Sequence, residues 1–209
     1  MKCPYQENDF CKQLSPETRA QVCAHCTIKK FAKGQHLAEP YFFDKFLIVL
    51  DGIITKMELD PSTQKMATSG IGCPGTLFSI GDLFPGPSDI NPDHRTSICI
   101  TDCVIASIDM KFIHQLFSTN VDFVRITFEN CYLYCIREKA VMMRDIGRGD
   151  VYNAVRYVIN LCRTRRLPLL THEQIALICN RSRPTVTSTM HQLIKQEPEL
   201  FSPLEFSKK

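Results

Sequence analysis

The most specific chemical pattern in the chain lies between residues 170 and 195, where two arginines stand beside short hydroxyl side chains. The guanidinium of Arg183 can present two parallel N–H donors to the two acceptors of a guanine edge, whereas Arg181 and Lys195 suit phosphate oxygens. These residue types predict contact with double-stranded DNA. The candidate residues are Thr171, Arg181, Ser182, Arg183, Thr185, Thr187, Ser188 and Lys195.

Two helices are needed to position these side chains. Thr171 and Gln174 form a capping box that starts one helix, and Ser182 can cap a second. Asn180, between them, is the non-glycine residue best suited to a left-handed turn, and Ala176 is small where a second helix must cross closely. This order predicts a helix-turn-helix whose second helix enters the major groove. An ordinary αα-hairpin is the alternative.

The formal net charge of +3 is unevenly distributed along the chain. Residues 149–209 carry nine Lys or Arg side chains and five Asp or Glu side chains, against sixteen and seventeen in the remainder. A local basic excess is what a phosphate-binding surface needs. Charge alone would equally suit a solvated surface.

A long helix is predicted over residues 121–146, because this segment contains neither Pro nor Gly. Apolar side chains recur there at heptad spacing, with Glu138 interrupting the seam. We expect the seam to pair with the same helix of a second subunit in a homodimer, unless the helix is buried within one chain. The seam residues are Val121, Val124, Phe128, Cys131, Cys135 and Met142.

Residues 31–109 have the texture of β-structure, with short apolar runs separated by turns such as Asp51-Gly52. A helix over 14–26 capped by Ser15, and another capped by Asp109, should flank them. The fold class is therefore α+β. We expect an N-terminal antiparallel β-barrel or jelly roll with its N-terminal helix (1–118), a dimerisation helix (119–148) and a helix-turn-helix domain (149–209).

The chain has eleven cysteines, and their expected chemistry depends on the cellular compartment of the protein. We find neither a signal peptide nor a membrane-spanning run, so we expect a cytoplasmic protein with reduced thiols and no membrane partner. An iron–sulfur cluster or another metal is one candidate use, and haem bound through a histidine is another. Small core-filling side chains are the alternative. The candidate metal ligands are Cys3, Cys11, Cys23 and Cys26.

From about residue 14 to 196 the chain resembles the CRP/FNR family. The resemblance is strongest over 170–193 and includes the barrel segments 31–35, 49–52 and 74–78. It implies a cyclic-nucleotide-binding-type barrel, a long dimer helix and a winged helix-turn-helix that acts with RNA polymerase. Arg183 matches the family's guanine-reading arginine, whereas Pro184 stands where many members carry a base-reading Glu. The short segment after Lys195 predicts a reduced wing.

The resemblance also implies where a small effector would bind. Arg95 and Thr96 resemble the Arg-Ser pair that holds the cyclic phosphate, and Glu138 and Lys139 fall near the family's adenine-contacting hydroxyls. Nucleotide-binding members place a ribose-binding Glu before that pair, where this chain has Ile80. Cyclic AMP is therefore not expected to bind, and the effector is unknown.

The sequence thus predicts a bacterial, sequence-specific DNA-binding transcription regulator, not an enzyme, controlled by an effector or redox signal at the barrel or dimer helix. One alternative is a cytosolic thiol or metal redox protein using Cys23 and Cys26, which should show a thioredoxin-like βαβ context. Another is a nucleotide-binding module without DNA binding, which would leave residues 170–195 unexplained.

Overall fold

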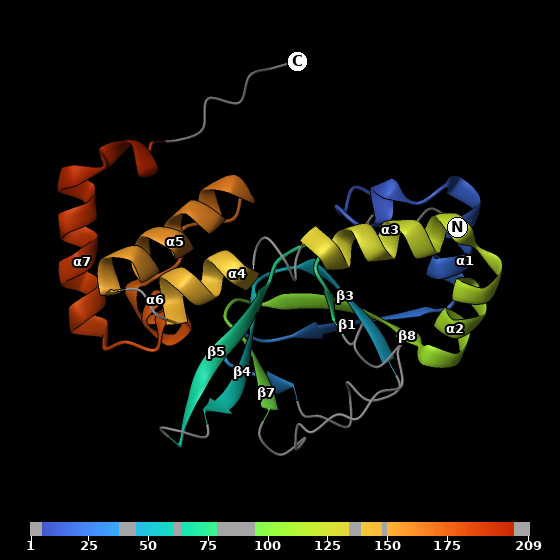
Figure 1. Cartoon of the computed structure of the whole chain (residues 1–209), viewed down its shortest axis with the longest axis horizontal. Coiled ribbons are helices and arrows are strands. Elements are labelled where there is room, and N and C mark those ends of the chain that lie inside the picture. Colours follow the sequence, from blue (N-terminus) through green and yellow to red (C-terminus); the bar gives the residue numbers. More distant parts are fainter. Residues whose placement is uncertain are drawn as a thin grey trace. The chain divides into compact units, whose positions relative to one another are not determined.

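The computed structural model describes residues 6–37, 45–60, 64–78, 95–133, 139–147 and 150–202. The chain divides into two compact units, residues 1–139 and 140–209, so the boundary falls inside the segment assigned to the dimerisation helix. Unit 1 contains the strands and unit 2 is helical in its described residues (Figure 1). No helix in the described ranges is both long and apolar enough to cross a membrane.

Unit 1 is built on two four-stranded antiparallel sheets with the strand orders β1-β8-β3-β6 and β2-β7-β4-β5. The strands are β1 Cys26–Phe31, β2 His36–Leu37, β3 Lys45–Asp51, β4 Ile54–Asp60, β5 Lys65–Gly72, β6 Leu77–Phe78, β7 Arg95–Cys99 and β8 Cys103–Asp109. The α+β class and the antiparallel architecture are therefore confirmed. Of the two expected forms, the paired sheets correspond to the jelly roll, and the described strands do not close into a barrel.

Strand β3 shows how the sequence produces the core. Successive side chains of a strand point to opposite faces, and β3 is buried on both. Phe46 and Ile48 join the apolar cluster beneath the helices of unit 1. Leu47 and Val49 belong to a second cluster, with residues of the other sheet. This double burial explains why β3 is an uninterrupted apolar run.

The turn between β3 and β4 requires its glycine. Gly52 has φ +86°, and a Cβ atom there would lie 2.2 Å from the carbonyl oxygen of Asp102. A larger residue would therefore be strained and would displace the backbone before β8.

The helices of unit 1 are α1 (Pro16–Ala24), α2 (Met110–Thr119) and α3 (Val121–Tyr132), preceded by the short 3-10 turn η1 (Cys11–Gln13). Ser15 caps α1 and Asp109 caps α2, as predicted. The helix expected over 14–26 is shorter than predicted, and β-structure begins at Cys26 rather than residue 31. The cause is tertiary: Cys26 pairs with Ile108 as β1 joins the edge of β8.

Unit 2 contains α5 (Val151–Thr164), α6 (His172–Cys179), α7 (Arg183–Gln196) and the 3-10 turn η7 (Pro198–Leu200). The short α4 (Lys139–Met142) and a π-helical turn, η6 (Met143–Gly147), precede them. The helix expected over 121–146 thus corresponds to α3 and to α4 with η6, and residues 134–138 lie outside the described part. No strand lies within 150–202.

Candidate nucleic-acid interface

Helix α5 provides the platform for the interface. Asp150 caps it, and its apolar side chains recur at helical spacing, so that Val155, Val158 and Ile159 are buried. Burial raises the pKa of the Cys162 thiol to about 11 and that of Cys179 in α6 to about 12. Both thiols are therefore protonated at neutral pH and serve as small core side chains.

The start of α6 is fixed by the predicted capping box. The Thr171 hydroxyl accepts the Gln174 amide at 3.3 Å, and the Gln174 side chain accepts the Thr171 amide at 2.9 Å. At the other end Asn180 adopts the left-handed conformation, with φ 51° and ψ 49°. The next amide, that of Arg181, donates to the Ala176 carbonyl at 3.0 Å. This turn redirects the chain into α7.

Ser182 caps α7 by accepting the Thr185 amide at 3.3 Å, and Pro184 lies in the first turn. Val186, Met190 and Leu193 are buried, which fixes the helix against its neighbours. Figure 1 shows α7 beside α5 and α6. The two caps, the left-handed turn and the buried face together confirm the predicted helix-turn-helix.

The first turn of α7 presents polar side chains to solvent. Arg181, Ser182, Arg183 and Thr185 are exposed, as are Thr171, Ser188 and Lys195, while Thr187 is half-buried. Within the described residues, the side chains of Arg183 and Lys195 have no hydrogen-bond or ion-pair partner. These cations therefore remain available to an anionic surface.

Two histidines beside this surface were missed by the sequence analysis. Nδ1 of His172, the first residue of α6, lies 3.0 Å from Oγ1 of Thr187 in α7. His191 is exposed and follows Ser188 by three residues on α7. Helical spacing could have identified His191. The contact of His172 joins two helices across 15 residues, so no local pattern reveals it.

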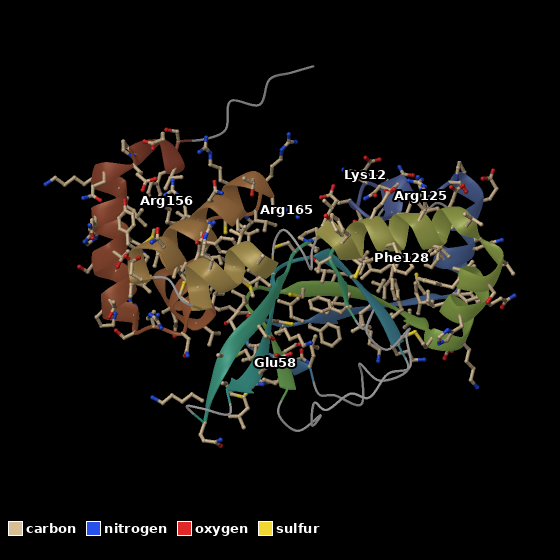
Figure 2. All side chains as sticks on the ribbon, viewed as in Figure 1. Lys12, Glu58, Arg125, Phe128, Arg156 and Arg165 are labelled. Carbon is tan, nitrogen blue, oxygen red and sulfur yellow. The ribbon has the colours of Figure 1, made fainter. Side chains whose placement is uncertain are left out.

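The far end of α7 is held by a polar cluster. Glu197 accepts a hydrogen bond from the Tyr152 hydroxyl at 2.7 Å and pairs with Nε of Arg156 at 2.7 Å. Arg156 is labelled on α5 in Figure 2. The Arg156 guanidinium, followed by the Tyr152 hydroxyl, lowers the pKa of Glu197. This cluster connects α5 to the residue that ends α7.

The proposed dimer seam lies partly on the surface of the single chain. On α3, Phe123 and Ile126 are buried in the cluster beneath the helices of unit 1. The exposed fractions are 82% for Val121 and 48% for Phe128, which Figure 2 labels. The other members of the seam are less exposed than Val121 and Phe128: Val124 and Cys131 are half-buried and Met142 is buried. Cys135 lies outside the described part of the chain.

The candidate effector residues are only partly described. Thr96 lies on β7, and its hydroxyl is 3.3 Å from Nδ1 of His36. The backbone of Arg95 pairs with Glu58 of β4. Glu138 and the side chains of Arg95 and Lys139 lie outside the described part of the chain, so this effector site stays a prediction.

Three of the four candidate metal ligands lie in the described part of the chain. Cys11 is buried in the apolar cluster beneath the helices, and Cys3 lies outside the described residues. Cys23 is in the last turn of α1, and the Cys26 thiol donates to its carbonyl at 3.4 Å. Among the described residues, no group of three or more His, Cys, Asp or Glu side chains is arranged to hold a metal ion.

No protein-family model matches the sequence. No curated protein matches it either.

Solved structures match the fold over most of the chain. FixK2 from Bradyrhizobium japonicum is 17% identical with a TM-score of 0.59, and the match covers 82% of this chain and 85% of that one. TTHB099, a transcriptional regulator of the CRP family from Thermus thermophilus, is 17% identical with a TM-score of 0.59. That match covers 85% of this chain and 98% of TTHB099. A cyclic nucleotide-binding domain-containing protein from Listeria monocytogenes is 14% identical with a TM-score of 0.60, covering 83% and 84%.

Proposed function

We propose that this protein, which has the fold of CRP/FNR-type regulators, is a sequence-specific DNA-binding transcription regulator of the bacterial cytoplasm. The observation that carries the proposal is the start of α7. Its Ser182 cap and buried apolar face hold Arg183 exposed at the first position of the helix. In a helix-turn-helix, that end of the second helix contacts the base edges in the major groove.

Phosphate contacts would come from the cations beside this end. Arg181 lies in the turn before α7, and Lys195 lies in its last turn. Contacts of these cations with phosphate do not depend on the DNA sequence, so they would orient the helix on the duplex without selecting bases. RNA polymerase would be the downstream partner of a regulator of this kind.

We propose that the protein acts as a homodimer through α3. The exposed Val121 and Phe128 support this, since a second copy would cover apolar surface that a single chain leaves in water. Two-fold symmetry would present two α7 helices to successive major grooves about 34 Å apart. An effector or redox signal in unit 1 would change that spacing by shifting the helix that leads to unit 2.

The alternative of a thiol oxidoreductase has less support. Reactive Cys-x-x-Cys pairs place a thiolate at a helix N-terminus, where the helix dipole stabilises it. Cys23 lies instead in the last turn of α1, and Cys26 begins a strand that pairs antiparallel with β8. Within residues 6–37, which the structure describes around these cysteines, there is no βαβ unit.

The test is a salt titration of binding to a labelled duplex of random sequence. Because binding releases counterions from phosphates, log K should fall linearly with log salt for the wild-type chain. The double variant Arg181→Ala/Lys195→Ala should have a shallower slope by about two units, because each substitution removes one cation that neutralises a phosphate. A wild-type chain that binds no duplex at about 50 mM salt would refute the proposal.

A further inference from the structure

The hydroxyl groups at the start of α7 are not equally available. Ser182 and Thr185 bond to each other, with their oxygens 2.6 Å apart. Thr189 donates back to the Thr185 carbonyl one turn earlier, at 2.9 Å. These three hydroxyls thus bond to partners within α7 and its cap.

Thr187 differs from its neighbours in having a partner on another helix. Its Oγ1 lies 3.0 Å from Nδ1 of His172, the first residue of α6. Thr187 follows Arg183 by four residues and therefore lies on the same side of α7 as that arginine. It is half-buried, at the border between the apolar face and the exposed arc. The Thr187 hydroxyl can therefore contact both the imidazole ring of His172 and the major groove of bound DNA.

We propose that His172 is a positioning residue for base recognition, acting through Thr187; this inference rests on the proposed function. A free hydroxyl rotates and can either donate or accept a hydrogen bond. A bond to Nδ1 fixes its direction. When Nδ1 carries the proton it donates to Thr187, and the hydroxyl proton points elsewhere, toward a base acceptor. When Nδ1 is unprotonated it accepts that proton, and the lone pairs of Oγ1 face a base donor. Either arrangement gives Thr187 one role.

The chemistry predicts which substitutions preserve this role. The side-chain amide of Asn reaches the place of Nδ1 in histidine, whereas that of Gln reaches the place of Nε2. Both amides are polar and similar in size, so they form a matched pair. His172→Asn should keep the contact with Thr187, and His172→Gln should lose it together with His172→Ala.

The test measures the affinity of the full-length chain for duplexes in which each base pair of a selected site is varied in turn. Thr187→Val should lower the preference at one base pair by about 3- to 10-fold, the worth of one hydrogen bond. His172→Ala and His172→Gln should lower it at the same base pair, and His172→Asn should restore it. The double variant His172→Ala/Thr187→Val should lose no more preference at that base pair than Thr187→Val alone. Equal helix circular dichroism across the variants checks folding.

Several results would overturn the inference. One such result is that His172→Ala leaves every base preference unchanged. Another is that it lowers the affinity for all duplexes by the same factor, as the loss of a phosphate contact would. If His172→Ala and Thr187→Val lowered the preference at two different base pairs, His172 would not act through Thr187. If the wild-type chain prefers no sequence at all, the proposed function itself fails and this inference falls with it. A wild-type preference that survives in all His172 variants refutes the inference alone.

Discussion

At the scale of single residues, Arg183 and Arg181 are neighbours with different expected roles. Arg183→Ala should cost about 1–3 kcal/mol on a specific site and relax the preference at one base pair, since it removes a two-donor contact with guanine. Arg181→Ala should weaken binding to all duplexes by a similar factor. It should also lower the slope of log K against log salt by about one unit. Fluorescence anisotropy on specific and random duplexes separates the two outcomes.

The matched control for both arginine variants is Arg165→Ala, which removes an exposed arginine that ends α5 rather than beginning α7. Its base preferences should equal those of the wild type. Equal losses by Arg183→Ala on specific and random duplexes would show that Arg183 is a phosphate contact only.

At the scale of elements, the polar cluster at the end of α7 predicts a pH dependence. The pKa of Glu197 in the folded protein lies below its ordinary value of 4.5, mainly because of Arg156. A carboxylate with a lowered pKa adds stability above its unfolded value and loses it as the pH falls through the folded one. Thermal unfolding followed by helix circular dichroism should therefore show a midpoint that decreases below about pH 4.5.

Glu197→Gln should remove part of that acid dependence and lower the midpoint at neutral pH. Glu199→Gln is the matched control, because Glu199 is an exposed glutamate two residues later in η7. An acid profile of Glu197→Gln that superimposes on the wild type would assign the stability change to other groups.

The elements also show what the sequence could reveal. Capping is local, so Ser15, Asp109, Thr171 and Ser182 each marked a helix start from neighbouring residues alone. The left-handed turn at Asn180 was readable for the same reason. The start of β1 at Cys26 was missed because it depends on pairing with β8, which is 80 residues away in the contact between Thr27 and Ser107. The bond from His172 to Thr187 was missed because it too is tertiary.

At the scale of the whole molecule, the seam on α3 predicts a dimer that charge can break. The double variant Val121→Glu/Phe128→Glu should have a mass near the 23.9 kDa of one chain by light scattering, because two carboxylates would be buried without partners. Lys111→Glu in α2 is the control, since it changes the net charge by the same amount away from the seam. A dimer that survives the double substitution would place the interface elsewhere.

The central claim is that α7 reads DNA sequence in a symmetric dimer, and selection of binding sites from a pool of random duplexes tests it most directly. The wild-type chain should enrich a two-fold symmetric site whose half-sites are about one helical turn, roughly 10 base pairs, apart. The same selection with Arg183→Ala should enrich a site that has lost its preference at one symmetric pair of positions. Recovery of no common sequence by the wild type, or of the same site by both proteins, would contradict the account.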